Sequence, residues 1–268
     1  MDSDQFSVNS SLRQALENGE INLQGQFLLG SNYSFLVKVR HEGQEIPAIY
    51  KPARGEQPLW DFPEASLAGR EVAAYLVSQA LGFGFVPLTV LRADGPFGPG
   101  SLQQFIEFDP NYHYFTFSES DRQRLRPVVL FDLLVNNADR KGSHLLIEKG
   151  TNKLWLIDHG LCFHAEDKLR TVLWDFVGEP IPEELQAALR IFRFSLHPSL
   201  RSPVPKALAQ AGQAPLPSTL HVSLSTTLAP YLQPDELAAL AARAEALLIN
   251  PIFPHPPEDR RAYPYPPL

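Results

Sequence analysis

Residues 135–160 read VNNADRKGSHLLIEKGTNKLWLIDHG, and this stretch carries the most informative pattern of the chain. An apolar helical pattern ends here in Asn, Asp and Gly, whose side chains or flexibility favour turns over helix. Two short apolar runs, HLLIE and KLWLI, follow on either side of the turn sequence KGTNK. This pattern predicts a β-hairpin. Its open end would bring Asp139, His144 and Asp158 together.

Asp139 and Asp158 are two carboxylates at the mouth of this hairpin. Such a pair suits two tasks, holding a divalent cation and accepting a proton. Taken singly, each has an ordinary interpretation that is favoured, because Asp is common in turns: Asp139 as a turn former and Asp158 as a strand-end cap. A catalytic interpretation therefore depends on what the rest of the chain supplies.

The composition is that of a globular protein with one large domain or two lobes. The chain has 268 residues, of which 44% are hydrophobic and 20% charged, and no apolar run approaches the ~20 residues of a membrane span. The polar N-terminus argues against a targeting segment, and the single cysteine, Cys162, fits a reducing cytoplasm. The net charge of −7 disfavours nucleic-acid and anionic membrane partners. We therefore expect a cytoplasmic protein without either partner.

The first 108 residues predict an N-terminal lobe with an antiparallel sheet and one helix packed on it. A short helix over residues 10–19 precedes it. Strand patterns then alternate with turn residues, and one long amphipathic pattern closes at a glycine. The expected strands span 21–30, 34–43, 45–53, 86–95 and 101–108, and the expected helix 64–82.

Residues 109–268 predict a mainly helical C-terminal lobe, so the fold class is α+β. Helices are expected over 122–135, 180–194 and 234–250, with the hairpin after the first of them. The tail that follows is rich in proline. Such a tail most often packs as extended coil or stays mobile, and recruitment of a protein partner is the alternative.

Three further features have the chemistry of a nucleotide site, whereas P-loop, nucleophile-elbow and zinc-protease motifs are missing from the sequence. Gly30, Ser31 and Asn32 form a small-residue hairpin tip whose amides can cap phosphate oxygens, although an ordinary hairpin explains them as well. Lys51 ends a strand, where it is either a solvated edge charge or a fixed cation. Glu71 on the next helix can form an ion pair that aims Lys51 at a nucleotide.

A glycine-bearing loop, a strand lysine, a helical glutamate, a catalytic loop and a metal-binding aspartate occur in this order in kinases. NNADRKGSH resembles the catalytic loop of the phosphatidylinositol 3-/4-kinase-like family, and LIDHGLCF resembles its metal-binding I-D-x-G motif. AIYK resembles its lysine strand and LLGSNYSF its phosphate-capping loop. The resemblance covers residues 24–163 and implies a two-lobed protein-kinase-like fold.

The resemblance also implies roles for individual residues. Asp139 would orient the acceptor hydroxyl and take its proton, and Asp158 would hold the metal that bridges the nucleotide phosphates. Lys51 would contact the phosphates, with Glu71 fixing it. Adenine would be read by backbone groups of the segment between the lobes, which comprises Gln104, Phe105, Ile106 and Glu107.

His144 departs from the family pattern, which has Asn at this position. An amide oxygen suits Mg²⁺, whereas imidazole prefers softer ions such as Mn²⁺ or Zn²⁺. Either the metal preference shifts, or water replaces His144 as a ligand, or phosphoryl transfer has been lost. A zinc cluster of His159, Cys162 and His164 is the less favoured alternative, because its spacing fits poorly and Cys162 reads better as a core residue.

These features together predict an ATP-dependent phosphotransferase that uses Mg²⁺ or Mn²⁺. The expected acceptor is a hydroxyl of a small soluble molecule or of a protein, because the acidic balance and the lack of a basic or apolar membrane face argue against an inositol lipid. A pseudokinase that only binds nucleotide is the first alternative. Adenylyl transfer on the same scaffold is the second.

Overall fold

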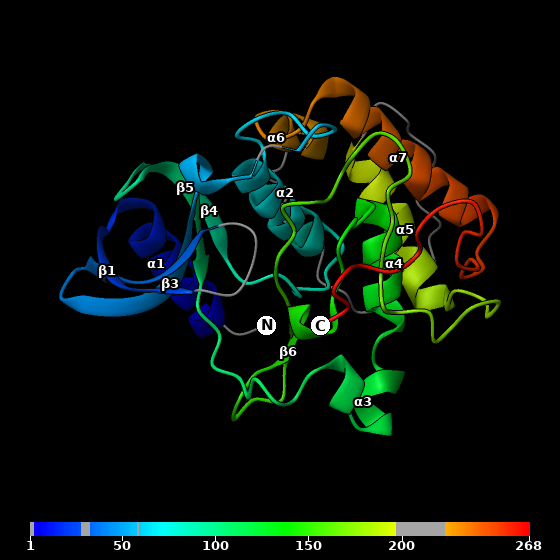
Figure 1. Ribbon diagram of the computed structural model, residues 1–268, viewed down its shortest axis with the longest axis horizontal. Helices are drawn as coiled ribbons and strands as arrows, with labels where there is room; N and C mark the ends of the chain where they lie inside the picture. The colour runs from blue at the N-terminus through cyan, green and yellow to red at the C-terminus, as the bar shows by residue number, and fades with distance from the viewer. Residues whose placement is uncertain (1–2, 28–32, 58, 197–222) are drawn as a thin grey trace.

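The computed structural model describes residues 3–27, 33–57, 59–196 and 223–268. A sheet-bearing part and a mainly helical part lie side by side, with one helix between them (Figure 1). We call them the sheet lobe and the helical lobe. The boundary at residue 108 stays a prediction.

The sheet lobe is built on one five-stranded antiparallel sheet in the order β1-β2-β3-β5-β4. All five predicted strands are confirmed, and the last of them ends at residue 104, where the chain leaves the sheet for the helical lobe. The strands are β1 (Glu20–Phe27), β2 (Ser34–His41), β3 (Gln44–Pro52), β4 (Thr89–Gly95) and β5 (Gly98–Gln104).

Helix α1 (Ser3–Asn18) packs on one face of this sheet (Figure 1). Its Leu16 is fully buried in a cluster with Ala48 and Tyr50 of β3. Because side chains alternate along a strand, Lys51 points to the opposite face. The sequence predicted that one helix packs on this sheet. In the structure α1 also packs on the sheet, on the face opposite the one to which Lys51 points.

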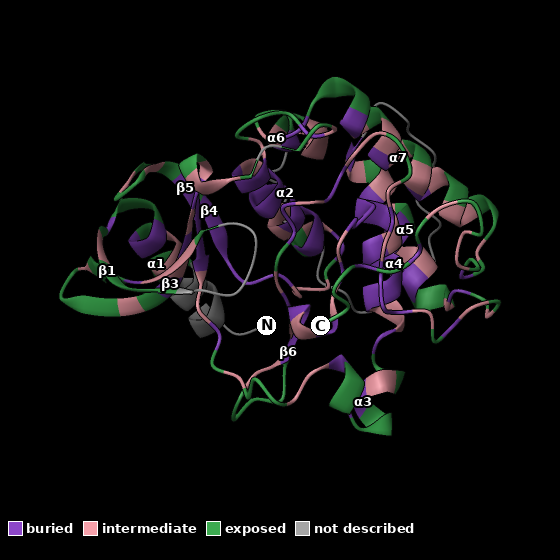
Figure 2. Ribbon diagram, in the orientation of Figure 1, coloured by how far each residue is buried: buried purple, intermediate pink, exposed green. Residues whose placement is uncertain are grey.

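Helix α2 (Leu67–Ala80) lies between the two lobes and is buried over most of its surface (Figure 2). Ala73 and Val77 belong to the main core of the helical lobe. The polar residues Glu71 and Ser78 of this helix are also buried. The helix therefore has no solvated face at these positions, because both lobes pack against it.

The helix predicted over 122–135 is confirmed from Arg126 onward, whereas a separate short helix precedes it. Helix α3 (Glu119–Gln123) is capped by Ser118, and α4 (Arg126–Val135) begins after a break at Leu125. Pro127 lies in the first turn of α4, a position that tolerates proline because the missing amide has no helical partner there.

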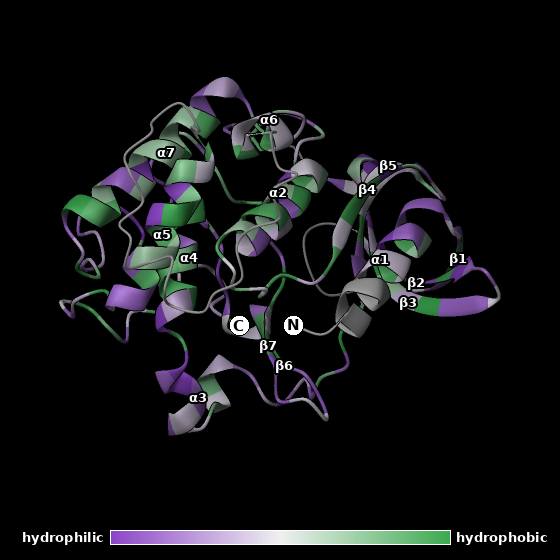
Figure 3. Ribbon diagram, turned by 180° about the vertical axis from the view of Figure 1, so that it is seen from behind, coloured by the Kyte–Doolittle hydropathy of each residue, from purple (hydrophilic) through white to green (hydrophobic). Residues whose placement is uncertain are grey.

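The predicted hairpin is confirmed, with Leu145 opposite Leu156 in the two short strands. The predicted C-terminal helices are also confirmed, and apolar residues concentrate on the faces where α4, α5 and α7 meet (Figure 3). The elements are β6 (Leu145–Ile147), β7 (Leu154–Leu156), α5 (Glu183–Leu196), α6 (Leu224–Leu228) and α7 (Pro234–Ile249), with 3₁₀ turns at Ala53–Gly55, Tyr114–Thr116 and Gly142–His144.

The proline-rich tail packs against the helical lobe as extended chain. The Thr171 amide donates to the Ala262 carbonyl at 3.0 Å, and the Gly142 amide donates to the Pro267 carbonyl at 2.8 Å. The part of the chain that the structure describes has no helix with the length and apolarity to cross a membrane. An antiparallel sheet with a buried helix, joined to a helical lobe that carries the loop and hairpin of the predicted site, is a two-lobed protein-kinase-like fold.

Candidate functional site

Lys51 lies between two carboxylates that come from different lobes. Its ammonium donates to Glu71 Oε1 at 2.5 Å and to Asp158 Oδ1 at 3.0 Å. Strand β3 carries Lys51, α2 carries Glu71, and the turn after β7 carries Asp158. The ion pair predicted between Lys51 and Glu71 is present, and Asp158 joins it.

The Lys51–Glu71 pair is shielded from solvent, because only 3% of the Glu71 side chain is exposed. Burial alone would lower the pKa of Lys51, but the charges of Asp158 and Glu71 raise it above its ordinary value. Glu71 Oε2 also accepts the backbone N–H of His159 at 3.1 Å. Glu71 thus connects the lysine strand with the residue that follows Asp158.

Asp158 adopts a left-handed backbone conformation, with φ of 62°, which non-glycine residues rarely take. Half of its side chain is exposed, although both oxygens have partners. The positive charge of Lys51 lowers the pKa of Asp158 against the effect of burial, so the group is a carboxylate throughout the physiological range. A strained, ionised and accessible carboxylate of this kind is typical of a functional position.

His144 is brought next to Asp158, as the hairpin predicted, with Nε2 at 3.3 Å from Oδ2. Its Nδ1 accepts the backbone N–H of Lys141 at 3.4 Å. Burial lowers the pKa of His144 to about 4, so the ring is neutral at pH 7. With Nδ1 accepting, the proton of the neutral ring is on Nε2, the nitrogen that lies next to Asp158. His144 is therefore an uncharged neighbour of the carboxylate.

Asp139 lies in the loop after α4, where its backbone N–H donates to Asn137 Oδ1 at 2.9 Å. Its carboxylate is 3.4 Å from the Lys141 ammonium. Burial raises the pKa of Asp139 to about 6, Lys141 opposes this shift, and the negative charge of Asp158 adds to it. A carboxylate with a pKa near neutrality has the chemistry of a general base.

Arg140 and Asp132 form a buried ion pair that sequence reasoning missed. The Arg140 guanidinium contacts both carboxylate oxygens of Asp132 on α4 at 2.9–3.1 Å. It also donates to the carbonyl of Ile157 at 3.0 Å and lies 2.9 Å from His159 Nε2. Arg140, which follows Asp139, thus contacts the residues on both sides of Asp158. These contacts fix Asp139 and Asp158 relative to each other.

One signal in the sequence indicates this pair. Asp132 is the only charged residue in VVLFDLLV, and a lone acid in an apolar helix needs a buried partner. Lys141, also missed, follows Asp139 by two residues and carries no pattern of its own.

Of the four residues predicted to read adenine, Gln104 ends β5, and Phe105, Ile106 and Glu107 lie in the segment that follows it toward the helical lobe. The Phe105 amide donates to Pro47 O at 3.2 Å, and Glu107 O accepts from the Lys149 amide at 2.9 Å. The Gln104 amide donates to Leu88 O at 2.9 Å. Ile106 lies between these hydrogen-bonded residues, and its amide has no hydrogen-bond partner among the described residues.

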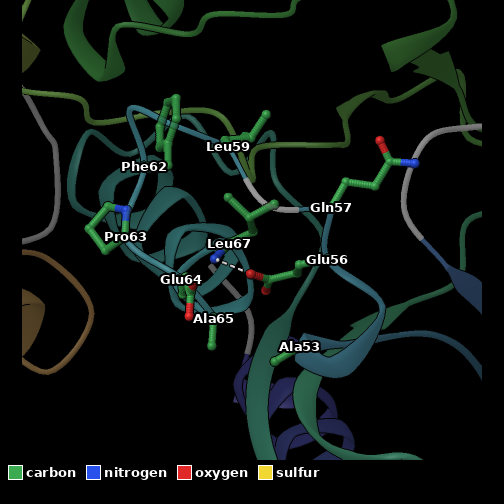
Figure 4. A pocket seen from close by; sticks show the side chains of 9 residues that line it. All are labelled: Ala53, Glu56, Gln57, Leu59, Phe62, Pro63, Glu64, Ala65 and Leu67. Atoms are coloured by element: carbon green, nitrogen blue, oxygen red, sulfur yellow. Dashed lines mark hydrogen bonds between the residues drawn. The ribbon is translucent and has the colours of Figure 1, made fainter.

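Gly30, Ser31 and Asn32, the predicted phosphate-capping tip, lie outside the described residues. Beside the site, a cavity of about 250 Å³ lies between the segment after β3 and the start of α2 (Figure 4). The carboxylate of Glu56 reaches the amides of Leu67 and Ala68, at 3.3 and 3.1 Å, and so caps α2.

Asp158 and His144 can contribute two ligands to a metal ion. Within the described ranges no group of three or more His, Cys, Asp or Glu side chains is placed to hold a metal. The alternative zinc cluster is not assembled, since Cys162 is a fully buried free thiol and His164 Nε2 contacts the carbonyl of Asp61 at 2.9 Å. The carboxylate oxygens of Asp158 fit Mg²⁺ or Mn²⁺, which complete their shell with water and substrate phosphates.

The curated relatives of the chain include the Mycobacterium tuberculosis protein Rv2133c, which is 35% identical over 286 residues. The match covers 94% of this chain and 93% of the relative. The chain belongs to the Rv2133c family. No family model matches the sequence, so the finer resemblance to the phosphatidylinositol 3-/4-kinase-like family stays a prediction.

Solved structures similar to the Rv2133c-family chain include kinases, all at a TM-score of 0.49. The Golgi casein kinase with Mn/ADP bound is 16% identical, and the match covers 92% of this chain and 76% of the kinase. The Helicobacter pylori proinflammatory kinase CtkA is 12% identical, with 89% and 94% covered, and hydra Fam20 with sugar is 14% identical, with 92% and 88% covered.

Proposed function

We propose that the chain binds ATP with a divalent cation between its lobes and transfers the γ-phosphoryl group to a hydroxyl. The observation that carries this proposal is the position of Lys51, held between Glu71 of α2 and Asp158 of the hairpin. A fixed ammonium next to an ionised, accessible carboxylate provides one site for phosphate oxygens and another for a cation.

Lys51 and Asp158 would together bind the triphosphate and its cation. The ammonium contacts phosphate oxygens, and Glu71 restricts its position because the pair is buried. Asp158 would hold the cation, which neutralises charge on the phosphates when it is bound. In the structure the oxygens of Asp158 contact Lys51 and His144, and these same oxygens would hold the cation.

Asp139 would act on the acceptor. Its carboxylate takes the proton of the acceptor hydroxyl, whose oxygen forms a bond to the γ-phosphorus while the bond to the β-phosphate oxygen breaks and ADP leaves. The pKa of about 6 makes Asp139 a carboxylate at pH 7 to 8 and still a competent base. Arg140 fixes the loop by its buried contacts with Asp132.

The adenine ring would bind along the segment that joins the lobes. The amides of Gln104 and Phe105 donate to carbonyls of the protein, which leaves the amides of Ile106 and Glu107 as the donors for an adenine nitrogen. The acceptor remains the hydroxyl of a small soluble molecule or a protein side chain.

The test is transfer of radiolabelled γ-phosphate from ATP, measured with Mg²⁺ and Mn²⁺ on wild type and Asp139→Asn. The proposal expects labelled product or phosphate release in wild type and a loss of roughly 100-fold or more in Asp139→Asn, since general-base catalysis contributes about 10²–10⁴-fold. Equal rates in both proteins would contradict it.

A nucleotide-binding module without turnover is a second candidate, favoured by His144. Its Nε2 lies 3.3 Å from Asp158 Oδ2, where the ring would compete with a cation for that oxygen. This candidate predicts ATP binding with no label transfer in either metal, and binding unaffected by Asp139→Asn.

A further inference from the structure

The segment 169–172 runs beside the loop of Asp139. The Arg170 amide donates to the Asn137 carbonyl at 2.9 Å, and the Arg140 amide donates to the Arg170 carbonyl at 3.0 Å. Arg140 and Thr171 thereby form a parallel bridge. These contacts fix the backbone of Arg170 directly beside the loop that carries Asp139.

Asp139 and Arg170 occupy equivalent places in the two segments, each just before a member of the bridge. Side chains alternate along extended backbone. Arg140 and Thr171 are 0% and 2% exposed, so both point into the protein. Asp139 and Arg170 are both partly exposed, as expected of side chains that point the other way. The acid and the guanidinium therefore share one face of the site.

The charge of Arg170 is not neutralised within the described part of the chain. Its side chain has neither an ion pair nor a hydrogen bond with any described residue. Lys168, on the same segment, is paired with Asp61, and Lys141 lies 3.4 Å from the carboxylate of Asp139. The nitrogens of Arg170 are not among the buried atoms that lack a partner, so solvent reaches them. An anionic ligand can therefore reach them as well.

The C-terminal tail holds this segment on its other side. The Arg260 guanidinium donates to the Leu169 carbonyl at 2.8 Å, and the Thr171 amide donates to the Ala262 carbonyl at 3.0 Å. Arg170 thus extends from a backbone that is fixed both before and after it. A donor on a fixed backbone loses less conformational freedom when it binds a ligand.

We propose that the acceptor of the phosphoryl group is a small alcohol with a phosphate or carboxylate group of its own, which binds to Arg170 while the hydroxyl lies at Asp139. This inference rests on the proposed function, in which the hydroxyl proton passes to Asp139, the oxygen bonds to the γ-phosphorus and ADP leaves. A guanidinium presents parallel donors that match two oxygens of one anionic group.

The charges around Asp139 explain why such an acceptor needs Arg170. Burial raises the pKa of Asp139 to about 6, and the positive charges of Lys141 and Arg170 oppose this shift, so the field of Arg170 reaches the carboxylate. At neutral pH the carboxylates of Asp139 and Asp158 repel a second anion, as does the net charge of −7. Arg170 offsets this repulsion at the place where the acceptor would bind.

The experiment is calorimetric titration of the nucleotide-free protein with matched alcohols. Glycerol 3-phosphate and glucose 6-phosphate carry a phosphate, glycerate and gluconate carry a carboxylate, and glycerol and glucose are the uncharged controls. At least one anion is expected to bind roughly tenfold or more tightly than its uncharged counterpart. Absence of binding by all the anions up to about 10 mM would overturn the proposal.

Variants locate the binding. Arg170→Gln removes the charge and is expected to lower the affinity for the anion roughly tenfold or more. Lys168→Gln removes one positive charge from the same segment and is the matched control, with an affinity within about twofold of wild type. Lys51→Met is expected to bind the anion as wild type does. A loss in Lys51→Met equal to that in Arg170→Gln would place the anion at the nucleotide site and overturn the proposal.

Folding of each variant is checked by its thermal transition. Arg170→Lys keeps the charge and loses the planar group, so its affinity is expected to fall between those of wild type and Arg170→Gln. If Arg170→Gln does not fold, Arg170→Lys decides, and an affinity equal to wild type in the folded variant would overturn the proposal.

Label transfer from ATP distinguishes failure of this inference from failure of the proposed function. Arg170→Gln is expected to raise the KM of the anionic acceptor roughly tenfold or more and to leave the KM of ATP unchanged. A higher KM for ATP instead, or ATP hydrolysis without label on any bound anion, would overturn this inference alone. Anion binding through Arg170 in a protein that neither binds nor cleaves ATP would overturn both.

Discussion

Arg70 of α2 and Glu236 of α7 form a buried ion pair that joins the sheet lobe to the helical lobe. Arg70 also donates to the carbonyl of Cys162 at 2.6 Å, and its side chain is 1% exposed. Glu71 is the next residue along α2. The contact that fixes α2 on the helical lobe is therefore adjacent to the contact that fixes Lys51.

Arg70→Met is expected to destabilise the protein by about 3–5 kcal/mol, because it leaves the Glu236 carboxylate buried without its partner. The measurement is urea unfolding. Arg190→Met is the control, since Arg190 pairs with Glu183 on the surface and such pairs contribute about 0–1 kcal/mol. Similar effects in the two variants would contradict a structural role for the buried pair.

Asp139→Asn is expected to raise the free energy of unfolding by about 1–3 kcal/mol at pH 8. Burial raises the pKa of Asp139 to about 6 in the folded protein, above its unfolded value near 4. Between these values the unfolded chain loses its proton first, so wild type loses stability as pH rises from 4 to 6. Below pH 4 the carboxyl group of Asp139 is protonated, so wild type and Asp139→Asn are both uncharged at this position. Urea titrations at pH 4 and pH 8 test this, and a difference independent of pH would refute it.

Glu71→Gln is expected to lower the rate of phosphoryl transfer roughly 100-fold while the fold is retained. Glutamine keeps an oxygen for the His159 amide but removes the charge that restricts Lys51. The measurement is label transfer at saturating ATP. Glu45→Gln is the matched control, because Glu45 lies on the same strand as Lys51 and pairs with exposed Lys38. A rate equal to wild type in Glu71→Gln would show that the pair does not orient Lys51.

His144→Asn is expected to raise the activity with Mg²⁺ relative to Mn²⁺, because an amide oxygen is a harder ligand than imidazole. The substitution does not change the net charge at pH 7, since burial lowers the pKa of His144 to about 4. The measurement is the ratio of kcat/KM in the two metals. His41→Asn on β2 serves as the control. An unchanged ratio would place His144 outside the metal shell, as an uncharged neighbour of Asp158.

The hairpin of the site was predictable because its signal is local. Apolar runs flank a turn, and this pattern alone places His144 beside Asp158. The ion pair between Lys51 and Glu71 followed from a strand next to a helix. His144 and Asp158 are only 14 residues apart in the sequence, and Lys51 and Glu71 only 20.

The contacts that fix the site were not predictable from such patterns. Arg70 and Glu236 are 166 residues apart, and neither interrupts its helical periodicity in a way that names its partner. Arg140 lies in the loop NNADRKGSH, where no pattern indicates that it is fully buried against Asp132. The pairing of buried charges depends on how the lobes pack. The hydrophobic periodicity of each helix carries no information about that packing.

The central claim is that Lys51 and Asp158 form one site for a nucleotide and its cation. The most direct measurement is calorimetric titration of wild type, Lys51→Met and Asp158→Ala with a non-hydrolysable ATP analogue in the presence of Mn²⁺. The account predicts binding to wild type and a loss of roughly tenfold or more in each variant. Absence of binding to wild type, or equal affinity in all three proteins, would contradict it.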